Sequence, residues 1–250
     1  MEGLLQTGSA IALHETIVAG PASPTGPNRP LAILFDRDHD EAREPQPKAG
    51  PMSPLEQLEH VNRTAEAVVA KVTDADLDKP TPCGTWVVRT ELNKLIASVI
   101  HTSRSVAEGV DDERMDLGDP PELIGDDPLA ALQSAHRDCE AAFGAEGAFD
   151  QEDLPVAVPG MRFPAPIVLA VRLFDTTVVT WDIARAIGVD HGIDAETAAA
   201  VKGMAEQIIP AVSGAPDRQR FQDAFTVDDD APMIDQMIAT TGRDPSWQGA

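Results

Sequence analysis

Apolar residues recur every three to four positions in four long stretches of this chain, and this spacing constrains the fold more than any other feature. Side chains three or four positions apart share one face of an α-helix. The stretches cover about residues 54–72, 86–108, 128–143 and 166–187. In the first, the apolar positions are Leu55, Leu58, Val61, Ala65, Val68, Val69 and Val72. The pattern predicts long amphipathic helices that bury their apolar faces against one another, as in a four-helix bundle.

The first predicted helix has clear start signals. Ser53 can cap its N-terminus, Pro54 suits the first helical position, and Glu56 completes a capping box with Ser53. Two further helices are expected near the C-terminus. One follows Asp194, and a short one covers about residues 232–241 before a glycine.

One segment has a strand-like pattern instead. Residues 154–158 and 161–163 alternate in polarity on either side of Pro159-Gly160, which predicts a small β-hairpin. Residues 73–85 are expected to be a loop. The predicted fold class is therefore all-α: a four-helix bundle with a small β-hairpin and extra C-terminal helices.

Composition excludes several functional classes. The chain has 250 residues, is 42% hydrophobic and carries a net charge of −23, so it can bury a sizeable core but should repel nucleic-acid phosphates. It has no run of about 18 apolar residues, which argues against a membrane helix. No Lys or Arg precedes Arg29, which argues against a secretory signal. With only Cys83 and Cys139, we expect two reduced thiols in a cytoplasmic protein.

Residues 1–51 differ from the rest. They contain seven of the 21 prolines, and their apolar pieces are too short to form a core. We expect either a disordered extension or an incorrectly annotated start, because Met52 stands directly before the strong helix start at Ser53. The folded domain is expected to be residues 52–250.

Two motifs resemble a known family. They are PTPCGTWVVR at residues 80–89 and DTTVVTWDIARAIG at residues 175–188. Both are similar to the metal-binding domain of the mycothiol-dependent maleylpyruvate isomerase family, within the DinB-like superfamily. DAP at residues 230–232 and GRDP at residues 242–245 resemble an actinobacterial-type subgroup. The resemblance covers residues 53–247 and implies a bacterial protein with a DinB-like four-helix bundle.

The resemblance also implies where a metal ion would bind. In the family, one histidine lies eight residues after the first Trp, and a carboxylate and a second histidine lie four residues apart on a later helix. Residues i and i+4 share a helix face, so both can bind one ion, and three ligands leave a position open for catalysis. In this chain the three positions hold Lys94, Asp175 and Val179. An ammonium has no lone pair and valine has no ligand atom, so Asp175 is the one family ligand type retained.

A different chemistry fits these residues. We expect the Lys94 ammonium to take roughly the place of the metal ion and to pair with Asp175, which would otherwise be a costly buried carboxylate. Val179 would fill the volume of the missing imidazole. The alternative is a shifted metal site that uses His101, seven positions after Lys94, together with Asp175 and an unidentified third ligand.

The other histidines are expected to have no ligand role. His60 and His136 are interpreted as partly exposed residues on other helices, and His191 as exposed in a turn.

The remaining motif residues are expected to be structural. Trp86 and Trp181 should pack in the core between facing helices. Asp182 can pair with Arg185, three positions later, or reach Arg89 on the second helix.

Cys83 precedes a helix N-terminus, where a thiol pKa can fall. We interpret it as a small buried hydrophobe, with a reactive nucleophile as the alternative.

Three functions remain open. The first is a non-catalytic, metal-free binder of a small molecule or a protein partner. The second is a metal-dependent mycothiol S-transferase or isomerase with Zn or Ni, and the third is a metal-free enzyme that uses the Lys94 amine.

Overall fold

The computed structural model describes residues 52–84, 86–109, 119–156, 161–212 and 223–249, with the side chains of 210–212 excepted. Its helices are α1 (Pro54–Val69), α2 (Val88–Glu108), α3 (Pro128–Gly144), α4 (Ala165–Ile187), α5 (Ala195–Val212) and α6 (Met233–Thr240). Two short 3-10 helices are η1 (Asp74–Asp76) and η2 (Ala148–Asp150). The predicted mainly helical fold is confirmed. The expectations for residues 1–51 lie outside the described residues.

The helix ends follow the predicted signals. Ser53 accepts a hydrogen bond from the backbone N–H of Glu56, and the Glu56 side chain accepts one from the backbone N–H of Ser53. These reciprocal bonds satisfy two donors that the first turn of α1 would otherwise leave unpaired. At the other end of the bundle, Gly188 closes α4 with φ of 76°, a left-handed conformation that glycine adopts without strain.

The small hairpin is also present. Strand β1 (Leu154–Pro155) pairs antiparallel with β2 (Arg162–Phe163). Leu154 lies opposite Phe163, and Pro155 lies opposite Arg162. The expected Pro159-Gly160 turn lies outside the described residues.

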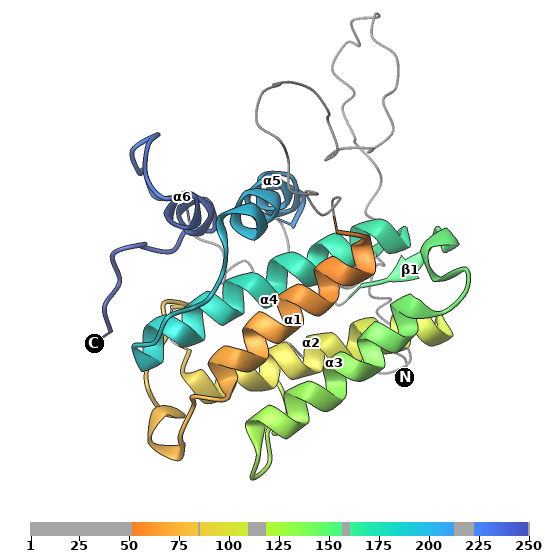
Figure 1. Ribbon diagram of the computed structural model, residues 1–250, viewed down its shortest axis with the longest axis horizontal. Helices are drawn as coiled ribbons and strands as arrows, with labels where there is room; N and C mark the ends of the chain where they lie inside the picture. The colour runs from red at the N-terminus through yellow and green to blue at the C-terminus, as the bar shows by residue number, and fades with distance from the viewer. Residues whose placement is uncertain (1–51, 85, 110–118, 157–160, 213–222, 250) are drawn as a thin grey trace, which may run out of the picture. The chain divides into compact units, whose positions relative to one another are not determined.

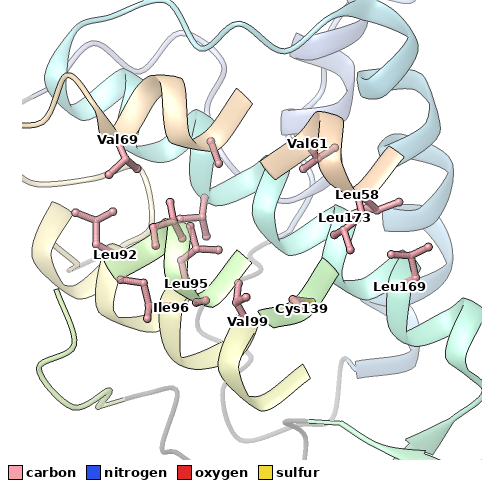
Figure 2. Packing of buried hydrophobic residues seen from close by; sticks show 14 of the residues in the cluster. Leu58, Val61, Val69, Leu92, Leu95, Ile96, Val99, Cys139, Leu169 and Leu173 are labelled. Atoms are coloured by element: carbon pink, nitrogen blue, oxygen red, sulfur yellow. The ribbon is translucent and has the colours of Figure 1, made fainter. Parts of the chain in front are cut away.

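The first four helices form the bundle. Helix α2 packs against α3 and α4, and α1 packs against the same two helices (Figure 1). Figure 2 shows how apolar side chains from all four helices point toward one another. The labelled residues are Leu58, Val61, Val69, Leu92, Leu95, Ile96, Val99, Cys139, Leu169 and Leu173. Most of the core is therefore built from the positions whose helical spacing is visible in the sequence.

Helix α4 is buried on two sides. Val179 and Ile183 belong to the bundle core, whereas Val178 and Trp181 belong to a second apolar cluster with residues of α5 and α6. Because both faces are covered, every residue from Thr176 to Ala184 is buried. Polar side chains in this part of α4 therefore need partners inside the protein.

None of the helices among the described residues combines the length and the apolar character needed to cross a membrane.

Candidate functional site

Asp175 lies at the centre of a buried ion cluster between α2 and α4. Lys94 of α2 contacts its Oδ1 atom, and Arg172 of α4 donates from Nη2 to its Oδ2 atom over 2.6 Å. Ser98 also donates to Oδ2 over 2.9 Å. The side chains of Lys94 and Arg172 are 1% and 2% exposed, and that of Asp175 is 16% exposed. The predicted contact between Lys94 and Asp175 is therefore present, within a larger network.

Arg172 uses its whole guanidinium in this network. It donates from Nε to Thr176 over 3.1 Å and from Nη1 to Ser98 over 2.6 Å. Its position three residues before Asp175 places both side chains on one face of α4. Two cations and the Ser98 hydroxyl therefore contact the Asp175 carboxylate, and such contacts stabilise the ionised form of a carboxylate.

Val179 lies one turn after Asp175 on the same face of α4. Its side chain is 3% exposed and packs in the bundle core. Valine cannot ligate an ion, so this part of the family's metal position is apolar here.

These residues do not fit a divalent metal ion at the family's position. The Lys94 ammonium faces the one carboxylate that could bind the ion, and Arg172 takes its second oxygen. A divalent ion beside Asp175 would face two buried positive charges and would have one protein ligand from the three family positions. The donor set instead suits an internal ion pair.

A second buried ion pair lies further along α4. Arg243, in the segment after α6, donates from Nε to both oxygens of Asp182 over 2.8 Å, and its Nη2 atom lies 2.7 Å from Oδ2. The Asp182 side chain is fully buried, and that of Arg243 is 5% exposed. Burial raises the pKa of Asp182, and the charge and hydrogen bonds of Arg243 oppose that rise.

Cys83 and Glu91 join this second pair. The ligand-type atoms of Cys83, Glu91 and Asp182 lie within 4.8 Å of one another, and all three residues are buried. Glu91 also accepts a hydrogen bond from the Thr81 hydroxyl over 3.2 Å. Burial lowers the pKa of the Arg243 guanidinium. The charge and hydrogen bonds of Asp182 raise it, as do the charges of Cys83 and Glu91, and the net shift is upward. A buried cation is therefore paired with one of these carboxylates, and its charge also interacts with the thiol and the other carboxylate.

The two clusters form one polar seam between α2, α4 and the segment after α6. The charge of Lys94 lowers the pKa of Asp182, and that of Asp175 raises it, so the two clusters interact. The ionisable members of this polar seam are Glu91, Lys94, Arg172, Asp175, Asp182 and Arg243. Three are cationic and three are acidic, so the polar seam as a whole is balanced in formal charge.

The structure corrects the expected partners of Asp182. It pairs with Arg243 rather than with Arg185 or Arg89, because the segment after α6 covers this part of α4. Arg89 instead lies 3.6 Å from Glu122 on the surface. Arg185 stacks over the Trp181 ring, with 5.1 Å between the guanidinium carbon and the ring centroid.

The two tryptophans differ from each other. Trp181 is fully buried, as expected, but it faces α5 and α6. The expectation for Trp86 is wrong, because Trp86 precedes α2, is half-buried and belongs to neither apolar cluster. An isolated antiparallel bridge joins Pro80 to Val87, directly before α2 begins.

One histidine is as exposed as expected, and two are more buried than expected. His60 is partly exposed, as expected, and contacts Asp194 over 2.8 Å. His136 is 1% exposed rather than partly exposed, because it lies in the α1–α3 interface with its Nδ1 atom 2.8 Å from Glu66. His191 is half-buried, and its Nδ1 atom accepts the backbone N–H of the residue two positions later.

The shifted metal site with His101 has no support in the described part of the chain. His101 is buried on α2, but the cluster of three metal-ligating groups found among the described residues contains neither His101 nor Asp175.

The two cysteines are buried and are not joined by a disulfide. Cys83 is buried as expected, but its neighbours Glu91 and Asp182 are acidic, so it is not simply a hydrophobic residue of the core. Cys139 lies in the bundle core, where burial raises the pKa of its thiol to about 12.

Sequence reasoning missed three members of the polar seam: Glu91, Arg172 and Arg243. Two signals were available. Glu91 and Lys94 interrupt an apolar helix face at helical spacing, and Arg172 precedes Asp175 by three positions. Arg243 lies in the GRDP motif, but its contact with Asp182 joins residues 61 positions apart, and local spacing cannot reveal such a contact.

Comparisons with known proteins agree with the architecture. The family model described as Mycothiol maleylpyruvate isomerase N-terminal domain matches residues 58–184, which cover most of α1, all of α2 and α3, and nearly all of α4. Two similar proteins are "Uncharacterized protein MT0763" and "Uncharacterized protein Rv0738", from the CDC 1551 / Oshkosh and H37Rv strains of Mycobacterium tuberculosis. Each is 23% identical over 192 residues, which cover 77% of this chain and 98% of the relative. No solved structure matches. The matched region ends before Arg243.

Proposed function

The chain belongs to the mycothiol maleylpyruvate isomerase N-terminal domain family, and from this premise we propose that it works without a metal ion at the family's metal position. In this proposal, residues 52–250 form a non-catalytic binding module for a small molecule or a protein partner. The proposal concerns the position defined by Lys94, Asp175 and Val179.

One observation carries the proposal: Lys94 and Arg172 hold the two oxygens of Asp175. A metal ion there would have to displace at least one of these cations from a carboxylate in the protein interior. Breaking a buried ion pair costs about 3–5 kcal/mol, because it leaves an uncompensated charge. One carboxylate ligand does not recover that energy by itself, since catalytic zinc sites use three protein ligands.

The position of Lys94 also argues against catalysis by its amine. A catalytic lysine must reach a substrate as a neutral nucleophile. Here the amine is 1% exposed and contacts a carboxylate, so a substrate cannot reach it without opening the interface between α2 and α4.

A hollow beside α4 is too small for an ordinary organic ligand. It is lined by Val61, Thr64, Thr177, Thr180, Ile193 and Thr197, and the space between these side chains does not admit a water-sized sphere. Binding pockets for such ligands usually measure about 300–1,000 Å³. The hollow therefore supports no ligand site at this place.

Elemental analysis tests the proposal. The full chain would be purified from its native host without chelators, and its Zn and Ni content would be compared with that of the variant Asp175→Asn. We expect equal metal content in both proteins. We also expect neither protein to accelerate the mycothiol-dependent isomerisation of maleylpyruvate. A stoichiometric metal that is lost with Asp175→Asn, together with isomerase activity, would instead establish the metal-dependent mycothiol S-transferase or isomerase.

A further inference from the structure

Cys83, Glu91 and Asp182 converge from three different elements. Cys83 lies in the loop before α2, Glu91 in the first turn of α2, and Asp182 in the last part of α4. Their sulfur and carboxylate oxygens lie within 4.8 Å of one another, and none of the three residues is exposed. A thiol and two carboxylates that meet inside a protein are costly unless a cation neutralises them.

The geometry is close to that of a three-ligand metal site. A tetrahedral zinc ion with bonds of about 2.0–2.3 Å places its ligand atoms roughly 3.3–3.8 Å apart. The three side chains would therefore have to move together by about 1 Å. Sulfur favours borderline-soft ions such as Zn²⁺ over Mg²⁺ or Ca²⁺, and three protein ligands leave one position open for a small molecule.

A cation already holds this place. The Arg243 guanidinium is paired with Asp182, and its charge also interacts with Cys83 and Glu91. With both carboxylates ionised and the thiol neutral, Arg243 leaves these groups with a formal charge of −1. A divalent ion that replaces the guanidinium and binds a Cys83 thiolate, with the thiol proton released to solvent, leaves the same charge of −1. The exchange therefore adds no uncompensated charge to the interior.

We propose that Cys83, Glu91 and Asp182 form a cation site that Arg243 occupies in this structure and that a divalent transition-metal ion such as Zn²⁺ takes when Arg243 withdraws. This site is separate from the family's metal position and goes beyond the proposed function, because Lys94, Asp175 and Val179 contribute no ligand to it.

Arg243 does not belong to the four helices of the bundle. It belongs to the segment after α6, and Gly242 before it has φ of 79°. The three candidate ligands lie on α2, on α4 and in the loop before α2, all within the family match. The family match ends before the segment that contains Arg243. Withdrawal of Arg243 would therefore involve the segment after α6 rather than a helix of the bundle.

Cobalt titration of the full chain tests the proposal, because Co²⁺ bound to a thiolate gives a near-ultraviolet charge-transfer band. We expect the wild-type protein to develop this band and to bind one Co²⁺ at this site. Arg243→Leu should bind Co²⁺ at least tenfold more tightly, because the competing guanidinium is gone. Cys83→Ser should show no band, and the matched control Cys139→Ser should show an unchanged band.

Two results would overturn the proposal. One is the absence of a thiolate band in both the wild-type protein and Arg243→Leu. The other is a band that persists in Cys83→Ser. If Arg243→Leu does not fold, Arg243→Lys replaces it, and the wild-type and Cys83→Ser titrations still decide the outcome. The family's position contains no sulfur, so a thiolate band separates this site from any metal bound at Asp175.

Discussion

Arg172 lies three residues before Asp175 on α4, and its Nη2 atom donates over 2.6 Å to Oδ2 of the carboxylate, whereas Lys94 contacts Oδ1. The carboxylate is thus held from two sides, by a cation of its own helix and by a cation of α2. Because two cations hold one carboxylate, substitutions of Lys94 and of Asp175 should differ in how much they lower the stability of the protein.

We predict that Lys94→Ala destabilises the protein by several kcal/mol, because it removes a buried charge partner and leaves a cavity (about 3–5 kcal/mol for breaking a buried pair). Lys94→Met should cost less, since it keeps the volume and leaves Asp175 paired with Arg172. The measurement is urea unfolding of each variant. Lys202→Ala is the control, because Lys202 pairs with Glu206 on the surface of α5 and should contribute at most about 0.5 kcal/mol. A near-neutral Lys94→Ala would contradict the prediction.

Asp175→Asn should be more destabilising than Lys94→Met. Asparagine is close to isosteric but carries no charge, so Lys94 and Arg172 would face each other as two buried cations. Lys94→Met, by contrast, leaves one cation and one carboxylate. The same unfolding experiment gives the order of the two variants, and a smaller effect for Asp175→Asn would show that the carboxylate is not the centre of the cluster.

Arg243→Leu should cost about 3–5 kcal/mol in the absence of metal, because it leaves Asp182 buried without its guanidinium. The matched control is Arg89→Leu, whose partner Glu122 lies 3.6 Å away on the surface and which should change stability by less than about 1 kcal/mol. Thermal unfolding of both variants checks the prediction. Equal shifts for the two arginines would mean that the pair with Asp182 does not anchor the segment after α6.

The pair of His136 and Glu66 should make stability depend on pH. Burial lowers the pKa of His136, an effect that Glu66 only partly offsets, so the unfolded chain binds more protons below about pH 6.5. Stability should therefore fall as the pH falls below about 6.5. The hydrogen bond from His136 also lowers the pKa of Glu66, which adds a further loss below about pH 4.3.

Urea unfolding between pH 7 and pH 5 measures the histidine contribution. His136→Gln retains a donor for Glu66 but cannot take up a proton, so its stability should fall less over this range than that of the wild-type protein. The same substitution at His60, which is partly exposed, serves as the control. Identical slopes for the wild-type protein and His136→Gln would contradict the prediction.

The helices were predictable from the sequence because their signals are local. Ser53 and Glu56 cap α1, and Gly188 ends α4. The hydrogen bonds of these caps join residues that are only a few positions apart in the chain. The residues of the bundle core were predictable for the same reason, because their apolar spacing is also a local pattern. The Lys94–Asp175 contact was predictable only through the resemblance, which aligned two distant positions on one metal site.

The second cluster was not predictable in this way. Asp182 has local candidates for a partner, and sequence spacing favours Arg185, but the segment after α6 places Arg243 closer. His136 was misjudged because its spacing on α3 does not reveal that Glu66 of α1 lies opposite. In both cases a long-range charge partner decides burial, and such pairs leave no periodic signal.

Restoring the family's ligands tests the central claim most directly, namely that Lys94 and Val179 stand where a metal ion would be bound with Asp175. The variant Lys94→His/Val179→His would be titrated with Co²⁺, with the triple variant that also carries Asp175→Asn as its control. We predict that the double variant gains a Co²⁺ site with visible ligand-field absorption in addition to any thiolate band that comes from Cys83, and that the triple variant loses this added site. A double variant that binds no more Co²⁺ at this position than the wild-type protein would contradict the claim.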